Sequence, residues 1–244
     1  MTEKQKRFEE LASRSNERGY AVYSDFLGLS EISELCAMRF SVPTNLWGGY
    51  EDAERCVACF GDREYFMDDN DYPIKCILIK PVNQKFADAL THRDFLGSLM
   101  GLGIRREMLG DIIISGNCGY LFCLDSISEY IIENLTQVRH TTVKCELTEN
   151  IPTDALPQPE SREIIVSSER LDVIVSAIYN MSRSQVLPIF HTEKVFVNGA
   201  VKISPSATIN IDDKVSVRGF GRFIYKGVLR TTKKNRFVIK VEVF

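Results

Sequence analysis

The sequence has few histidines and no long apolar run. Its three histidines, His92, His140 and His191, are far apart and show neither His-x-x-x-His nor Glu-x-x-His spacing. No apolar stretch approaches the roughly 20 residues of a membrane-spanning helix, and the N-terminal stretch is too charged for a signal peptide. We therefore expect no histidine-based metal site, no contact with a membrane and a cytoplasmic location.

The cysteines lack the pattern of a disulfide framework or a zinc site. The seven cysteines are odd in number and lie within the first 145 residues, unlike the cysteines of secreted disulfide-rich domains. Cys56 and Cys59 form a Cys-x-x-Cys motif, but neither Cys36 nor Cys76 supplies the second pair that a structural zinc site needs. A redox pair would follow a strand in a thioredoxin-like unit, which the sequence does not show. We interpret these residues as ordinary, partly buried thiols.

The sequence also lacks recognisable catalytic motifs. It contains no nucleophile elbow, phosphate-binding loop, kinase motif set or paired-carboxylate arrangement. Gly101-Leu102-Gly103 resembles dinucleotide-binding glycines only weakly, because it falls at the end of a predicted helix and not at a strand-to-helix turn. We expect a protein that is not an enzyme and that needs no cofactor and no metal.

Charge is divided unevenly along the chain. Residues 1–163 contain 17 Lys+Arg and 27 Asp+Glu, whereas residues 164–244 contain 13 and 6. The overall formal net charge of −3 hides this division. Such asymmetry favours contact between the basic segment and a polyanion.

A proline-rich stretch marks the clearest domain boundary. Residues 148–163 contain Pro152, Pro157 and Pro159, and proline fixes φ and restricts the residue before it. This stretch is predicted to be an extended, stiff linker. The basic domain then spans residues 164–244.

The first 73 residues form an acidic region. They contain 8 basic and 15 acidic residues, which disfavours direct nucleic-acid binding there. Helical patterns occur near residues 3–18 and 30–40, followed by Gly- and acid-rich chain without a regular pattern. We predict a mostly helical N-terminal segment over residues 1–73.

Residues 74–147 show alternating strand and helix patterns. The predicted elements are residues 73–82, 91–104, 111–115, 119–124, 126–135 and 139–147. Their order, β-α-β-β-α-β, is that of the ferredoxin-like fold shared by RNA-recognition modules. The spacings of Thr91 with Asp94 and of Ser126 with Glu129 predict capping boxes at the two helix starts.

Two aromatic residues of this domain lie on one face of a predicted strand. Tyr120 and Phe122 are placed as stacking aromatics are in RNA-recognition modules, but the basic residue before the glycine of that motif is missing. The domain also contains equal numbers of basic and acidic residues, 8 of each. We therefore favour one ring in the core and the other exposed over an RNA-binding sheet.

The basic domain begins with two predicted helices. The first spans residues 168–180, with Ser168 as N-cap and an apolar face made of Leu171, Ile174, Val175 and Ile178. The second begins after Ser182, which has the spacing of a capping box with Gln185.

Arg183 lies at the start of the second helix, between two serines. Free amide groups and the helix dipole attract anions to a helix N-terminus. The guanidinium of Arg183 can hold a phosphate through two hydrogen bonds, and Ser184 adds a hydroxyl donor. The sequence "SRS" therefore predicts a small phosphate clamp, although a plain helix cap with a solvated arginine is the alternative.

A hairpin and an acidic turn complete an ordered set of motifs. Asn198-Gly199 is predicted to join two strands, and a turn at Asp212-Asp213 leads into the strand "KVSVRG". With Arg170-Leu171-Asp172 and Ser182-Arg183-Ser184, this set resembles the RNA-binding domain named after ribosomal small-subunit protein S-four, over about 55 residues.

This resemblance implies that the two helices and the following hairpin form a positively charged surface that grips folded RNA. The implied RNA-binding residues are Arg170, Ser182, Arg183, Ser184, Gln185, Lys194, Asn198, Lys202, Arg218 and Arg222. Two positions depart from the family pattern. Pro188 lies inside the second helix and is expected to shorten or kink it, and Glu193 occupies a turn where the family usually has glycine.

Most of the chain resembles a more specific family. The segments "YSDFLGLSE", "GGYEDAERC", "HRDFLGSLMGLGIRREMLGDI" and "SVRGFGRF" occur in this order, as in YlmH-type proteins, which are bacterial RNA-binding proteins. The resemblance implies association with ribosomal RNA and tRNA on the large ribosomal subunit and a role in the rescue of stalled translation.

The predicted fold class is α+β, with an N-terminal helical segment, a central RNA-recognition-like domain, and an S-four-type domain with a β extension. We expect a monomer that binds structured RNA. Two alternatives remain open. Residues 1–147 could be an unrecognised catalytic unit of an RNA-modifying enzyme, similar to a pseudouridine synthase, or the acidic residues 1–73 could dock a basic protein partner.

Overall fold

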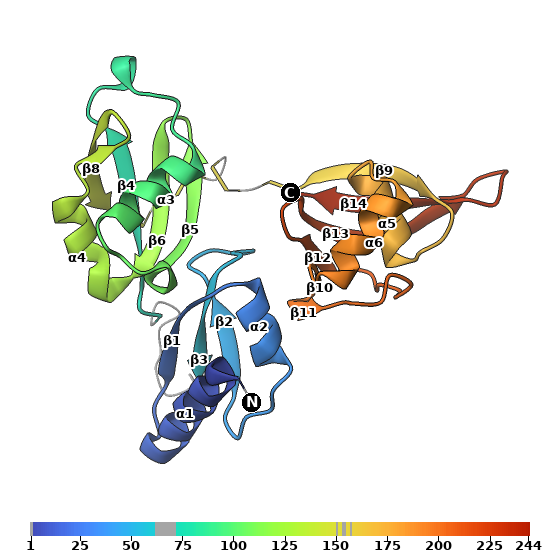
Figure 1. The fold of residues 1–244 in the computed structure, drawn as a ribbon, viewed down its shortest axis with the longest axis horizontal. Coiled ribbons are helices and arrows are strands. Elements are labelled where there is room, and N and C mark those ends of the chain that lie inside the picture. Colours follow the sequence, from blue (N-terminus) through green and yellow to red (C-terminus); the bar gives the residue numbers. More distant parts are fainter. Residues whose placement is uncertain (1, 62–71, 150, 153–154, 157) are drawn as a thin grey trace. The chain divides into compact units, whose positions relative to one another are not determined.

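The computed structural model describes residues 2–61, 72–149, 151–152, 155–156 and 158–244 (Figure 1). The chain divides into two compact units, of which the first comprises Met1–Glu31 and Met38–Leu156 and the second Ile32–Ala37 and Pro157–Phe244. Both units contain helices and antiparallel sheets, so the fold is α+β. None of the described helices has the length and apolar character needed to cross a membrane.

The first unit begins with a small α+β layer. Its elements are α1 (Glu3–Arg18), β1 (Val22–Leu27), β2 (Thr44–Trp47) and β3 (Cys56–Phe60), together with the start of α2 (Leu29–Cys36), whose residues from Ile32 onward are assigned to the second unit. The strands form an antiparallel sheet in the order β1-β3-β2, and α1 packs on β1 and β3. The two helices were predicted, but the description of the segment as mostly helical was wrong, because it missed this sheet.

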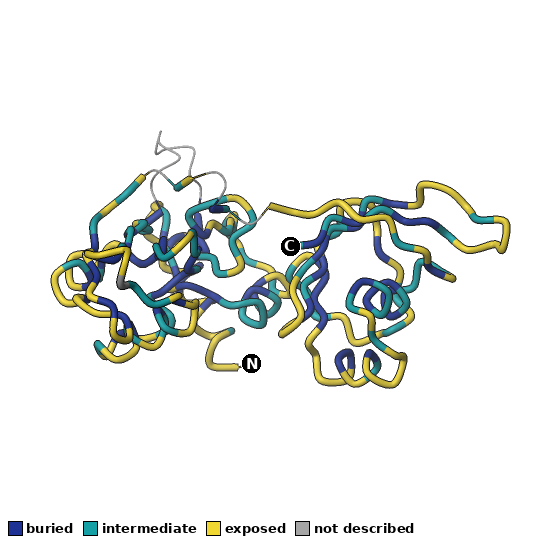
Figure 2. Tube along the Cα trace, turned by 90° about the horizontal axis from the view of Figure 1, so that it is seen from above, coloured by how far each residue is buried: buried dark blue, intermediate teal, exposed yellow. Residues whose placement is uncertain are grey.

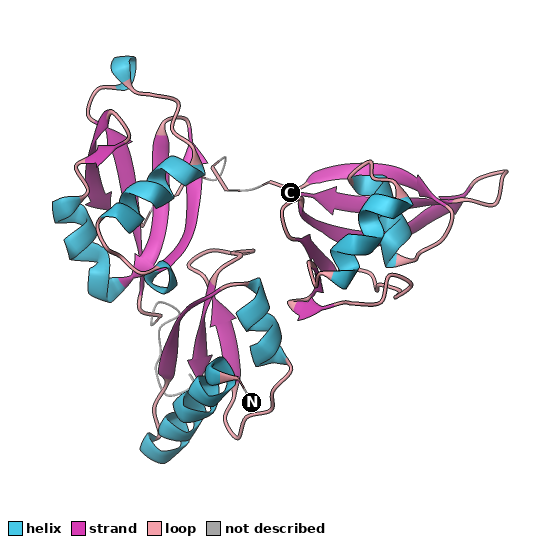
Figure 3. Cartoon of the chain, in the orientation of Figure 1, coloured by secondary structure: helices cyan, strands magenta, loops and turns pink. Residues whose placement is uncertain are grey.

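The second layer of this unit is a larger antiparallel sheet. Its elements are β4 (Ile74–Pro81), α3 (His92–Gly101), β5 (Leu109–Ser115), β6 (Cys118–Leu124), α4 (Asp125–Asn134), β7 (Gln137–Val138) and β8 (Thr141–Leu147). The strand order is β5-β6-β4-β8-β7, and α3 and α4 lie over one sheet face (Figure 3). The predicted β-α-β-β-α-β order of elements is confirmed.

One of the two predicted helix caps in this layer forms. Thr91 and Asp94 make a capping box, in which the Asp94 carboxylate accepts from the Thr91 amide at 2.8 Å. The box predicted at Ser126 is absent, because α4 begins at Asp125 and extended Leu124 takes the cap position. Strand β6 therefore runs directly into the helix and leaves Ser126 inside its first turn.

The second unit is built on a six-stranded antiparallel sheet. Its elements are β9 (Glu160–Val166), α5 (Leu171–Ile178), α6 (Arg183–His191), β10 (Val195–Val197), β11 (Ala200–Val201), β12 (Lys214–Val217), β13 (Gly221–Thr231) and β14 (Phe237–Val243). The strand order is β11-β10-β12-β13-β14-β9. Helices α5 and α6 bury their apolar faces against one side of this sheet (Figure 2).

Strand β9 begins within the segment that was predicted to be linker. Glu160 pairs with Val243 and Val166 pairs with Phe237, so β9 forms an edge of the sheet. The predicted linker therefore ends at least four residues too late. Pro152 and Pro159 lie before the strand, where their missing amides cost no sheet hydrogen bonds, and Pro157 lies outside the described residues.

Helix α5 starts later than predicted. Arg170, not Ser168, occupies the N-cap position. The first amides of the helix are satisfied by a distant loop, since Leu171 donates to the Ala207 carbonyl at 2.9 Å and Asp172 to the Pro205 carbonyl at 3.0 Å. The helix start therefore depends on tertiary hydrogen bonds and needs no serine cap.

Candidate nucleic-acid interface

The start of α6 has the capped geometry that the sequence predicted. Ser182 is the N-cap residue, with φ −73° and ψ 160°, and forms a capping box with Gln185. The Gln185 side-chain oxygen accepts from the Ser182 amide at 2.8 Å, and the Ser182 and Ser184 hydroxyls lie 2.9 Å apart. These contacts fix the first turn of α6 and so the position of Arg183.

Arg183 is exposed and borders a small polar hollow. Within the described part of the chain, its guanidinium makes no ion pair. The hollow has a volume of about 280 Å³ and is lined by Ser167, Ser168, Arg170, Asp172, Val173, Ser176, Arg183 and Val186. Residues from the start of α5 and the start of α6 thus share one concave surface that carries two guanidinium groups.

Arg170 lies on this surface but is already paired. Its guanidinium donates to both oxygens of Asp172, at 3.0 and 2.7 Å, and this ion pair raises the pKa of Arg170. Asp172 is 5% exposed and also accepts a hydrogen bond from the Val173 amide. Arg170 therefore offers less positive charge to a ligand than Arg183, which the sequence pattern did not reveal.

Three other predicted residues gather at one end of the strands that follow α6. Lys194 precedes β10, Arg218 follows β12, and the Arg218 amide donates to the Lys194 carbonyl at 2.9 Å. Lys202 follows β11, and its amide donates to the Val195 carbonyl at 2.8 Å. All three side chains are exposed. We call Lys194, Lys202 and Arg218 the strand-end cluster.

Two arginines near these strands lie over aromatic rings. The Arg218 guanidinium carbon is 5.7 Å from the centroid of Phe196, and that of Arg222 is 4.2 Å from the centroid of Phe244. Such stacking helps to hold a guanidinium in place on the surface.

Asn198 has a structural contact that accounts for its place in the motif. Its side-chain amide donates to Asp213 at 2.8 Å, and its oxygen accepts from the Lys214 amide at 2.9 Å. Asn198 also has a positive φ of 50°, which asparagine tolerates better than most residues. The residue thus holds the acidic turn against the hairpin, and its side chain has little capacity left for RNA.

The two departures from the family pattern are accommodated. Helix α6 continues through Pro188 to His191, so this proline does not end the helix. Glu193 has a φ of 54°, the left-handed conformation that glycine adopts most readily. The glycine that the resemblance leads one to expect at this position would meet this backbone requirement without strain.

The larger sheet of the first unit has one face that carries no helix. This face is covered by the N-terminal sheet of the same unit. Tyr120 and Phe122 are 8% and 1% exposed and pack with Phe26 and Val57 of the N-terminal sheet. The prediction that one of the two rings would be exposed was wrong. Because both rings are buried, this face cannot stack RNA bases as an RNA-recognition module does.

The most specific family segments hold these two layers together. Asp111 accepts hydrogen bonds from the Tyr50 hydroxyl at 3.0 Å and the Glu54 amide at 2.7 Å. Arg55 donates to the Leu109 carbonyl at 2.9 Å, and Arg106 donates to the same carbonyl at 2.6 Å. Burial lowers the pKa of Arg106 to about 10. Arg106 is therefore committed to backbone oxygens and is not a surface phosphate ligand.

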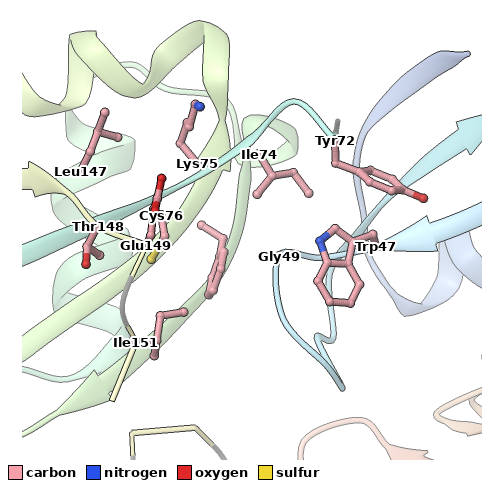
Figure 4. A pocket seen from close by; sticks show the side chains of 11 residues that line it. Trp47, Gly49, Tyr72, Ile74, Lys75, Cys76, Leu147, Thr148, Glu149 and Ile151 are labelled. Carbon is pink, nitrogen blue, oxygen red and sulfur yellow. The ribbon is translucent and has the colours of Figure 1, made fainter. Parts of the chain in front are cut away.

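A second hollow lies in the first unit, between Trp47 and Tyr72 on one side and Leu147 and Thr148 on the other (Figure 4). Its volume is about 790 Å³. Its lining includes one cationic and one anionic side chain, Lys75 and Glu149. These opposite charges give it no clear preference for phosphate.

The cysteines do not form a site in the described structure. All seven lie in the described part of the chain, and none of them is in a disulfide bond there. Cys56 and Cys59 lie three positions apart on strand β3, so their side chains point to opposite sheet faces. Within the described ranges, no group of three or more His, Cys, Asp or Glu is arranged to hold a metal ion.

Comparisons with known proteins agree with the sequence resemblance. Residues 68–151 match the family described as "Putative RNA-binding domain in YlmH". The chain is 30% identical over 228 residues to the Bacillus subtilis (strain 168) protein named "Ribosome-associated protein quality control protein P2", covering 90% of this chain and 86% of that protein. A solved structure titled "Cell division protein ylmH from Streptococcus pneumoniae" aligns with a TM-score of 0.49 and 18% identity, covering 59% of this chain and 88% of that one. The chain belongs to the YlmH family.

Proposed function

We propose that this protein binds ribosomal RNA and tRNA on the large ribosomal subunit through an S-four-type C-terminal domain. The observation that carries the proposal is Arg183, held at the capped start of α6 beside a polar hollow and left without an ion pair in the described structure. The strand-end cluster adds three exposed cations in the same unit. The name of the Bacillus subtilis relative supports a role in the quality control of stalled translation.

The proposed interface contacts RNA backbone, not base edges. Lys and Arg side chains on a rigid surface recognise phosphates, which position a protein on RNA without reading its sequence. We further propose that the protein acts as a monomer in the cytoplasm, without catalysis and without a cofactor. The absence of a recognisable catalytic motif in the sequence supports this view.

Cosedimentation with ribosomes across a salt series tests the proposal. A protein that neutralises several phosphates leaves RNA steeply as salt rises, because each contact releases counterions. We expect the full chain to sediment with large subunits at low salt and to dissociate steeply. A shallow salt dependence would instead favour docking on a ribosomal protein, and a mass change in treated RNA would favour the enzyme alternative.

A further inference from the structure

Strands β13 and β14 extend into a hairpin whose turn comprises residues 232–236. The last paired residues are Thr231 with Phe237 and Arg230 with Val238. The turn projects away from helices α5 and α6 (Figure 1) and is exposed (Figure 2). We call residues 232–236 the hairpin tip.

The hairpin tip concentrates positive charge. Residues 214–241 contain nine Lys+Arg and no Asp or Glu, and three of these cations, Lys233, Lys234 and Arg236, lie in the tip and are exposed. In the described structure none of the three makes an ion pair. By contrast, Arg230 pairs with Glu163 at 2.8 Å and Lys226 with Asp212 at 2.7 Å. Two cations of the strands are thus paired, whereas the three of the tip make no ion pair in the described structure.

The tip has a defined conformation. The Thr232 amide donates to the Arg236 carbonyl at 2.7 Å, and the Asn235 amide donates to the Thr232 carbonyl at 2.9 Å. The Thr232 hydroxyl also accepts from the Arg236 amide at 3.1 Å. A preformed loop loses little conformational entropy when it binds. The backbone that carries the three cations is therefore held in one turn conformation.

The composition of the tip distinguishes between possible partners. Protein interfaces have cores rich in aromatic and apolar side chains, and membrane-binding segments insert apolar residues. The sequence of the tip, Thr-Lys-Lys-Asn-Arg, contains neither. Cations beside hydroxyl and amide groups are the composition of a phosphate-contacting loop.

We propose that the hairpin tip is a second RNA-contacting site that binds backbone phosphates away from the start of α6. Arg222, at the base of β13, and Lys233 are eleven residues apart, which at about 3.3 Å per residue gives a separation of up to roughly 36 Å. The tip can therefore reach a different stretch of a long RNA helix. This inference rests on the proposed function, since it assumes that the second unit binds RNA.

The test compares variants of the full chain on two RNA hairpins, one with a stem of one helical turn and one with a stem of three turns. The tip variant carries Lys233→Gln, Lys234→Gln and Arg236→Gln. The control variant carries Lys6→Gln, Arg14→Gln and Lys85→Gln, which remove the same charge from exposed positions of the first unit. Thermal melts establish that each variant is folded.

We expect the tip variant to lose roughly tenfold in affinity for the long stem at moderate salt, with a salt slope smaller by up to about 3. Its affinity for the short stem and the behaviour of the control variant should change little. An unchanged affinity for the long stem, or an equal loss on both stems, would overturn the inference. If the unaltered protein binds neither RNA, the proposed function itself fails.

Discussion

The guanidinium of Arg170 is held by both carboxylate oxygens of Asp172, at 3.0 and 2.7 Å. Asp172 is almost fully buried, and it places a negative charge beside the hollow that Arg183 borders. The pair therefore limits the positive potential of the candidate interface while it stabilises the start of α5.

Replacing Asp172 by Asn should separate these two effects. We expect Asp172→Asn to raise RNA affinity several-fold, because Arg170 is released and a carboxylate is removed from the surface. The melting temperature should fall, because the helix start loses an ion pair and an N-terminal negative charge. Filter binding and thermal melts measure the two quantities. Weaker RNA binding by a folded variant would show that the Arg170–Asp172 pair is itself part of the binding surface.

Arg183 gives the most direct test of the interface. A hydrogen bond to a charged group contributes about 1.5–3 kcal/mol, so Arg183→Glu should weaken RNA binding at least tenfold and make the salt slope shallower. Arg183→Lys should have a smaller effect, since it keeps the charge and loses the two-pronged geometry. RNA titrations at several salt concentrations check this order. If a folded Arg183→Glu protein binds RNA with unchanged affinity, the Ser182-Arg183-Ser184 segment is a plain helix cap and not a phosphate clamp.

Ser182 should act through helix order and not through direct contact. Removing an N-cap hydroxyl costs about 1 kcal/mol, so Ser182→Ala should lower the melting temperature by a few degrees. The loss of RNA affinity should be smaller than for Arg183→Glu. If the loss of binding free energy for RNA exceeds the loss of unfolding free energy, the serine hydroxyl contacts the phosphate.

Asp111 should be important for the fold of the first unit and not for RNA binding. Asp111→Ala removes the acceptor of the hydrogen bonds from the Tyr50 hydroxyl and the Glu54 amide, at an expected cost of about 1–3 kcal/mol. Chemical denaturation followed by fluorescence measures this loss. RNA affinity below the unfolding transition should remain unchanged, and a strong decrease would place an RNA contact in the first unit.

His92 should make stability depend on pH. Burial and the nearby Arg106 lower the pKa of His92 below its usual value of 6.5. The unfolded chain therefore binds a proton at higher pH than the folded chain, and stability falls as pH drops below about 6.5. Melting temperatures at pH 7.5 and pH 5.5 should differ less for His92→Asn than for the unaltered protein. If the melting temperatures of the two proteins change equally between these pH values, His92 is not the cause of the pH dependence.

Local patterns predicted some features well. The capping box of Ser182 with Gln185 and the Asn198-Gly199 turn each depend on a few neighbouring residues, and the structure confirms them. The apolar face of α5 is also confirmed.

Features that depend on distant residues were not predictable. Ser168 gave way to Arg170 as N-cap because a loop some 35 residues later satisfies the first amides of α5. Tyr120 and Phe122 are both buried because a sheet from the N-terminal segment covers them. Short strands such as β2 and β3 carry little periodic signal. Neither the N-terminal sheet nor its packing over Tyr120 and Phe122 could therefore be inferred from the sequence.

The pairing of β9 with β14 also affects how the second unit folds. Its first strand completes the sheet only by binding its last one, and Glu160 lies opposite Val243. During synthesis, β9 therefore cannot complete its pairing until Val243 has left the ribosomal exit tunnel, because contacts between such distant residues form late. A nascent chain stalled before β14 would expose the unpaired edge of β9 and would present its basic residues without the sheet that orients them.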